Sequence, residues 1–115
     1  MDPIVDQYMN GYCMFMAAAI HHKSGLPIGL MTVTHPCGVK LSHAWIDLPD
    51  GKCLDIQGVQ RFEQMNEWIY DVELEFKIYR NTTLQHLEEL SKANLGAEEK
   101  DVRLALEIAL ERKLI

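Results

Sequence analysis

The first half of the chain contains a cysteine, a histidine and an aspartate, Cys13, His43 and Asp55, of the types that together perform acyl transfer through a thiol. A cysteine attacks a carbonyl carbon as its thiolate, and a helix N-terminus or a neighbouring imidazolium stabilises that thiolate. An imidazole can then protonate the leaving amine, while a carboxylate on its other ring nitrogen fixes its orientation. Taken singly, each residue also has an ordinary structural explanation, as a core cysteine, a hydrogen-bonded strand histidine or an aspartate after a turn. The chemistry therefore depends on whether the fold brings the three together.

The segment around Cys13 has the pattern of a buried helix. Asn10-Gly11 is followed by an apolar run over residues 12–20, which includes three consecutive alanines, the strongest helix formers. The run stops at Ser24-Gly25-Leu26-Pro27, where the glycine can cap the helix and the proline prevents its continuation. We therefore expect Cys13 in the first turn of this helix, where unpaired amides and the helix dipole favour a thiolate.

His43 and Asp55 are expected on neighbouring strands. The sequence predicts strands over residues 28–34, 40–48 and 52–56, with turns at His35-Pro36-Cys37-Gly38 and Pro49-Asp50-Gly51. The middle strand alternates, so that one face carries Leu41, His43, Trp45 and Asp47. A hairpin at Asp50-Gly51 makes residues 47 and 54, or 46 and 55, near neighbours. Asp55 then lies on the strand beside His43, in a register that the sequence leaves open.

The second half of the chain completes an α+β layout. We expect a short helix over 60–70, a strand over 74–79, a helix capped by Thr82 or Thr83 that runs to about residue 93, and a last helix over 97–113. The apolar stripe of the last helix contains Val102, Leu104, Ala105, Ile108 and Ala109. Residues 1–115 are predicted to form a single domain, in which an N-terminal helix packs on a small antiparallel sheet with additional C-terminal helices.

Four short motifs follow one another in an order that resembles the transglutaminase-like family: Gly11-Tyr12-Cys13, Gly25-Leu26-Pro27, His43-Ala44-Trp45 and Leu54-Asp55. The resemblance covers Asn10 to Gly58, less than half of the chain. It implies a papain-like or transglutaminase-like core in which Cys13 is the nucleophile, His43 the general base and acid, and Asp55 the residue that orients the histidine. The intervals between the motifs are shorter than is usual in that family.

The same resemblance suggests three further site residues. The wider papain-like superfamily often has a glutamine six residues before the nucleophile, and Gln7 has this spacing from Cys13. Its amide, together with the backbone N–H of Cys13, would bind the oxyanion of a tetrahedral intermediate; a solvent-exposed Gln7 is the alternative. Trp45 and Tyr12 are expected to contact the substrate, although Trp45 also suits a core position.

The composition of the chain limits the kinds of partner and cofactor that we expect. The net charge is -6, from 17 acidic and 11 basic residues, which argues against a nucleic-acid partner. The longest apolar stretch is far shorter than a membrane helix, and the first residues lack the basic region of a secretory signal, so we expect a cytoplasmic location and no membrane. Zinc sites normally have two pairs of closely spaced ligands, whereas only His35-x-Cys37 comes close, so no metal or other cofactor is expected.

These observations predict a thiol enzyme that acts on an amide bond of a protein or peptide substrate. Hydrolysis, by a peptidase or deamidase, is favoured over a transglutaminase because water is always available as acceptor. The alternative is a non-catalytic binding or inhibitor protein that keeps the scaffold; the short length and missing loops favour it, as would an origin in a phage or mobile element. A third is a structural subunit that uses its acidic C-terminal helices, where Leu87, Leu90, Leu104 and Ile108 could also seat a partner or form a dimer.

Overall fold

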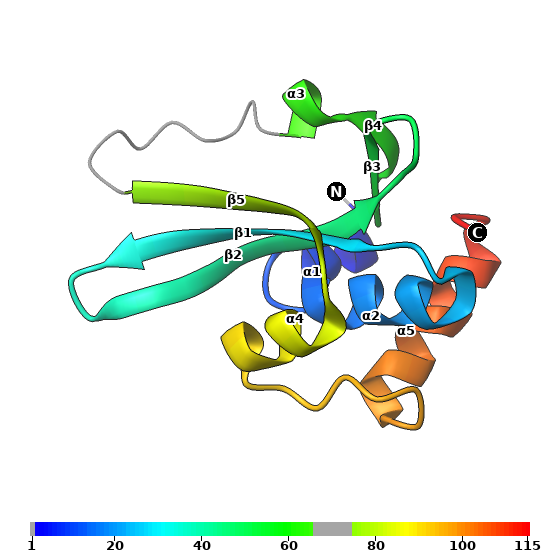
Figure 1. Ribbon diagram of the computed structural model, residues 1–115. Coiled ribbons are helices and arrows are strands. Elements are labelled where there is room, and N and C mark those ends of the chain that lie inside the picture. The colour runs from blue at the N-terminus through cyan, green and yellow to red at the C-terminus, as the bar shows by residue number, and fades with distance from the viewer. Residues whose placement is uncertain (1, 66–74) are drawn as a thin grey trace.

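A computed structural model describes residues 2–65 and 75–115 as one antiparallel sheet covered by helices (Figure 1). The elements follow in the order α1 (Pro3–Met9), α2 (Cys13–Ser24), β1 (Ile28–His35), β2 (Gly38–Asp47), β3 (Lys52–Asp55), β4 (Gly58–Arg61), α3 (Phe62–Met65), β5 (Glu75–Thr82), α4 (Leu84–Ser91) and α5 (Lys100–Glu111). The five strands lie in the order β4-β3-β2-β1-β5, and each neighbouring pair is antiparallel. The expected α+β class is confirmed.

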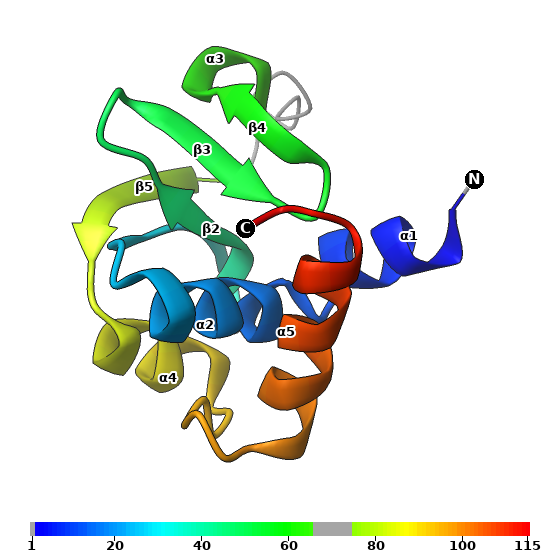
Figure 2. The same cartoon turned by 90° about the vertical axis from the view of Figure 1, so that its right-hand side faces the viewer.

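Helix α2 lies in the centre of a helical layer on one side of the sheet. Figures 1 and 2 show α1, α4 and α5 around it, all on the same side. The helix ends as predicted, because Gly25 adopts a left-handed conformation (φ 74°) and its N–H donates to the carbonyl oxygen of His21. The alanines at positions 17–19 are buried, which lets neighbouring elements approach the helix closely. The first residue of this buried helix is Cys13.

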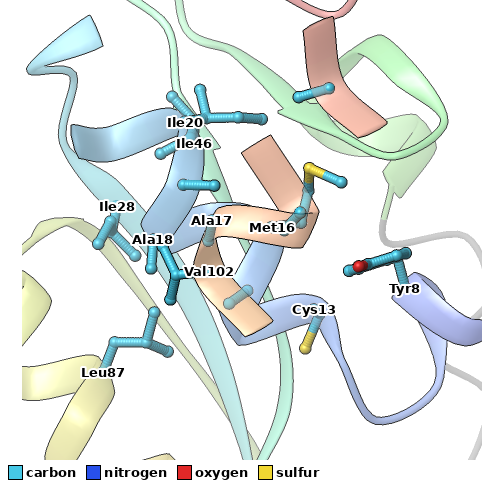
Figure 3. Packing of buried hydrophobic residues seen from close by; sticks show 14 of the residues in the cluster. Tyr8, Cys13, Met16, Ala17, Ala18, Ile20, Ile28, Ile46, Leu87 and Val102 are labelled. Carbon is cyan, nitrogen blue, oxygen red and sulfur yellow. The ribbon is translucent and has the colours of Figure 1, made fainter. Parts of the chain in front are cut away.

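Helix α5 packs on α2 through small residues. Val102, Ala105 and Ala109 are buried and belong to the same cluster as Met16, Ile20, Ile28 and Ile46, part of which is shown in Figure 3. The predicted apolar stripe is wrong at Leu104, whose side chain is 44% exposed. Leu87 of α4, considered above as a partner contact, is fully buried and belongs to the main cluster instead.

A second, smaller cluster lies on the opposite face of the sheet. Met31, Trp45 and Cys53 form it, with Phe62 and Phe76 packed against them. Trp45 is fully buried, and its indole N–H donates to Asp47 Oδ1 at 2.9 Å. It pairs across the strands with Gly29, whose missing Cβ leaves the space that the indole ring occupies. The strand alternation therefore separates Trp45 from Ala44 and Ile46, which face the helices.

The pairing of the strands differs from the sequence-based expectation at two points. Ile46 pairs with Leu54 and Asp47 with Cys53, one residue away from the expected register. Between β1 and β2 the pairing shifts, because Met31 pairs with His43 but Thr32 pairs with Leu41. This bulge turns Leu41 to the helix-covered face, where it packs against the main cluster, so Leu41 does not share a face with Trp45 as predicted.

Outside this core the helices and strands were predicted less well. Helix α1 was not expected, and the first residues of the expected helix over 60–70 form the end of β4 and the short α3, while residues 66–70 lie outside the described residues, as does Leu74. The strand over 75–79 continues to Thr82. Thr83 caps α4, as predicted, by accepting a hydrogen bond from the N–H of His86. Within residues 2–65 and 75–115, no helix has the length and apolar character needed to cross a bilayer.

Candidate active site

Cys13 occupies the first position of α2, at the end of a tight connection from α1. Gly11 makes the turn possible with a φ of 119°, and the N–H of Tyr12 donates to the carbonyl oxygen of Gln7 at 3.2 Å. Tyr12, at the N-cap position, makes no side-chain capping hydrogen bond, and the first turn of α2 contains no acidic residue. The positive end of the helix dipole therefore acts on the cysteine sulfur without a competing carboxylate from the same turn. Figure 3 shows Cys13 at the margin of the core cluster, with Tyr8 of α1 nearby.

His43 and Asp55 form a buried pair. The Nε2 atom of His43 lies 3.0 Å from Oδ2 of Asp55, and the two residues are 1% and 3% exposed. The register of β2 and β3 explains why His43 and Asp55 meet. Continued by one residue, this register places Asp55 opposite Trp45. The side chain of Asp55 then projects from the same face of the sheet as His43, which lies two residues before Trp45. The expectation that Asp55 lies beside His43 is met, although the expected pairing of 46 with 55 is replaced by 46 with 54.

The carboxylate of Asp55 is fixed by further donors. Its Oδ1 atom accepts a hydrogen bond from the backbone N–H of Gln57 at 2.8 Å and from the side-chain amide of Gln60 at 3.0 Å. Asp55 therefore has a partner on each oxygen, and its orientation toward His43 is determined by the turn between β3 and β4. Sequence reasoning missed both glutamines. The available signal was Asp55-Ile56-Gln57-Gly58, since an aspartate two residues before a backbone donor often closes a turn of this kind.

The environment of His43 favours its protonated form. Burial alone would lower the pKa of the imidazole, but hydrogen bonds to Asp55 and to Cys13, with the charges of both groups, outweigh it and raise the pKa to about 9. At neutral pH the histidine is therefore an imidazolium that is bonded to a carboxylate and whose charge is also favoured by Cys13, and such an imidazolium supports a thiolate in return.

An open pocket of about 400 Å³ adjoins Cys13. Its walls come from the start of α2, from the β1–β2 turn and the first residues of β2, and from the end of α4. They are Gly11, Cys13, Met14, Cys37, Gly38, Val39, Lys40, Leu41, Ser42, Leu90, Ser91 and Lys92. The volume falls in the range of small-molecule and peptide side-chain pockets. Sequence reasoning did not foresee a contribution from α4, because nothing local links residues 90–92 to Cys13.

The three other predicted site residues differ in their positions. Tyr12 is 38% exposed beside Cys13, and Gln7 has an exposed side chain on α1, so the roles of both in binding substrate and oxyanion stay predictions. The substrate contact predicted for Trp45 is wrong in this structure, because its side chain is fully buried. Its ring centroid lies 6.0 Å from that of His43, so Trp45 packs beside the histidine and limits where the imidazole can move.

The three cysteines of the chain are free, and within the described ranges no group of three or more His, Cys, Asp or Glu side chains could hold a metal ion. The site therefore consists of Cys13, His43 and Asp55 with the adjoining pocket. No protein-family model, curated protein or solved structure matches this chain.

Proposed function

We propose that this chain is a thiol-dependent acyl-transfer enzyme that acts on the amide bond of a protein or peptide substrate. Cys13 is the nucleophile, His43 the general acid and base, and Asp55 the residue that orients His43. The observation that carries the proposal is the buried His43, which is bonded to Asp55 at 3.0 Å through one nitrogen and has its pKa raised partly by Cys13. The papain-like or transglutaminase-like core that the motifs suggest is supported by the order of the elements: the cysteine begins α2, the histidine lies on β2 and the aspartate ends β3.

In the acylation half of the reaction, the Cys13 sulfur forms a bond to the substrate carbonyl carbon. The resulting oxyanion is positioned to accept a hydrogen bond from the backbone N–H of Cys13 at the start of α2. The imidazolium of His43 gives its Nδ1 proton to the amide nitrogen, the carbon–nitrogen bond breaks, and the amine leaves. The products are a thioester on Cys13 and a neutral imidazole.

In the second half, His43 takes a proton from an incoming water molecule, whose oxygen attacks the thioester. The carbon–sulfur bond then breaks, and the acid product, the Cys13 thiolate and the His43 imidazolium are restored. Water as acceptor makes the protein a peptidase or a deamidase, whereas an amine would make it a transglutaminase. We favour hydrolysis because water is always available as acceptor and the pocket beside Cys13 opens to solvent.

One observation favours a second candidate, a binding protein without turnover. Cys13 is only 4% exposed and belongs to the main apolar cluster, as an inert core cysteine would. In that case the pocket would bind a partner or ligand, and the buried His43–Asp55 pair would be structural.

The two candidates differ in the pH dependence of Cys13 alkylation. Iodoacetamide labelling, followed peptide by peptide with mass spectrometry, separates Cys13 from the exposed Cys37. For the enzyme we expect Cys13 to react at pH 6 nearly as fast as at pH 8, and His43→Ala to remove the reaction at pH 6. His35→Ala, at the end of the neighbouring strand β1, is the matched control and should leave the profile unchanged. A Cys13 rate that rises only toward pH 8.5 in both the parent protein and His43→Ala would favour the binding protein.

The proposed location is the cytoplasm. The free state of all three cysteines agrees with a reducing compartment, where thiol enzymes remain active without a disulfide framework.

A further inference from the structure

The pocket beside Cys13 carries positive charge in an acidic protein. The whole chain has 17 acidic and 11 basic residues, yet the twelve residues that line this pocket include Lys40 and Lys92 and no aspartate or glutamate. The two lysines come from different elements, one from β2 and one from the residue that ends α4, so they converge only in the folded chain.

Neither ammonium group makes an ion pair with a carboxylate of the described residues. Among the residues that the structure describes, the lysine ion pairs are those of Lys52 with Asp50 and of Lys77 with Glu75, so Lys40 and Lys92 have none. The two carboxylates of α4 nearest in sequence to Lys92 have other partners: Glu88 accepts the backbone N–H of Leu95 at 3.1 Å, and Glu89 accepts the side-chain amide of Gln85 at 3.3 Å. Two lysines at one pocket, both without an ion pair in the described part of the chain, attract an anion from the ligand.

The position of Lys92 is determined by the backbone. The residue adopts a left-handed conformation with a φ of 57°, and its N–H donates to the carbonyl oxygen of Glu88 at 2.8 Å. This C-cap geometry fixes the direction in which its side chain leaves α4. The remaining wall includes the apolar side chains of Met14, Val39 and Leu41, which suit an aliphatic stem between the charged group and the reacting carbonyl.

We infer that this pocket selects an amide substrate that bears a carboxylate close to the scissile bond, an acidic peptide, and that Lys40 and Lys92 bind that carboxylate while the acyl carbon lies at Cys13. The inference rests on the proposed function, since it names the substrate class of the same thiol. Lys40 and Lys92 are specificity-determining residues and take no part in bond making or breaking.

Iodoacetate and iodoacetamide test this directly, because they have nearly the same shape and differ in charge. The quantity to measure is the ratio of the two alkylation rates at Cys13, divided by the same ratio for N-acetylcysteine. We expect this normalised ratio to be raised about fivefold at low ionic strength, to fall about two- to threefold on replacing either lysine by glutamine, and to approach unity in Lys40→Gln/Lys92→Gln. The preference should also weaken in about 1 M salt, which screens the charges.

The control is Lys23→Gln/Lys77→Gln, which removes the same charge from exposed positions outside the pocket and should keep the ratio. A parent ratio near unity, or an equal loss in the control, would overturn the inference. Inorganic phosphate and glutarate can also be compared, at matched ionic strength, for how strongly each protects Cys13 from alkylation. Stronger protection by phosphate would overturn the inference in favour of a phosphorylated substrate. Because the ratio compares two reagents at one thiol, it is independent of the pH profile with iodoacetamide alone, on which the proposed function depends.

Discussion

The imidazole of His43 is bonded through Nε2 to Asp55 at 3.0 Å, and Asp55 and Cys13 together raise its pKa. This relationship needs three separate features of the chain. The glycine turn before α2 places Cys13 at the helix start, the bulge beside Ser42 sets the direction of His43, and the β3–β4 turn holds Asp55. A change in any one of them should be visible in the titration of His43.

His43 should titrate near pH 9, well above an ordinary histidine at about 6.5. The raised pKa means that the imidazolium is present throughout neutral pH and is lost only as the pH rises through about 9, which removes the proton donor for the leaving amine. Removing Cys13, by Cys13→Ala, or the charge of Asp55, by Asp55→Asn, should each lower the midpoint, since both groups raise it. Heteronuclear NMR of the histidine ring protons measures this midpoint directly. A midpoint near 6.5 in the parent protein would contradict the proposed pair.

Replacement of Asp55 should cost stability as well as reactivity. Asp55→Ala leaves the buried Nε2 of His43 and the N–H of Gln57 without their acceptor, and we expect the free energy of unfolding to fall by about 3 to 5 kcal/mol. Asp55→Asn keeps the shape, so it should cost less, but the rate of Cys13 alkylation at pH 6 should fall about tenfold or more. Urea denaturation and the alkylation assay measure the two effects separately.

Asp50→Ala is the matched control for Asp55. Its carboxylate is exposed and pairs with Lys52 at 3.6 Å at the surface, so the free energy of unfolding should change by less than about 1 kcal/mol. Equal losses for Asp50 and Asp55 would show that the buried pair contributes no more than a turn aspartate.

The local part of this structure could be predicted from the sequence. The start and end of α2 follow from Asn10-Gly11 and Ser24-Gly25-Leu26-Pro27, and the β2–β3 hairpin follows from Pro49-Asp50-Gly51, because each depends on backbone preferences of adjacent residues. The same motifs predicted the candidate cysteine, histidine and aspartate. These signals are local, so they can be recognised in the sequence without knowledge of the tertiary fold.

The features that the sequence did not predict depend on contacts between distant segments. The bulge that turns Leu41 toward the helices is a property of the β1–β2 pairing, and the alternation of polar and apolar residues cannot show it. The burial of Trp45 depends on the space left by Gly29 on the neighbouring strand. The pocket wall from Leu90 to Lys92 depends on how α4 folds back onto α2, which no short motif encodes.

The contact between Gly29 and Trp45 predicts a specific sensitivity. A Cβ at position 29 would collide with the indole ring of Trp45, so Gly29→Ala should lower the free energy of unfolding by about 1 to 3 kcal/mol. Gly96→Ala, where the new Cβ meets Asn94 Oδ1 at an ordinary 3.4 Å, is the control and should change it by less than about 0.5 kcal/mol. Chemical denaturation with far-ultraviolet circular dichroism gives both values.

A double-mutant cycle assigns the cost of Gly29→Ala to the indole ring. Trp45→Phe alone loses the hydrogen bond to Asp47, but in the Gly29→Ala background it also relieves the collision, so it should cost at least about 0.5 kcal/mol less there. Additive costs would mean that Gly29 is required for another reason.

The three cysteines should differ in their reactivity toward iodoacetamide. Cys53 is 1% exposed, and burial, with a further contribution from the charge of Asp47, raises the pKa of its thiol to about 11. At pH 8 only about one Cys53 side chain in a thousand is a thiolate, so native Cys53 should stay unlabelled by iodoacetamide while the exposed Cys37 is labelled. At pH 6 we expect Cys13 to react faster than the two other cysteines. Labelling in concentrated urea should make the three equal, which controls for the detection of each peptide. Rapid native labelling of Cys53 would show that the second cluster, with Met31 and Trp45, opens far more often than its packing implies.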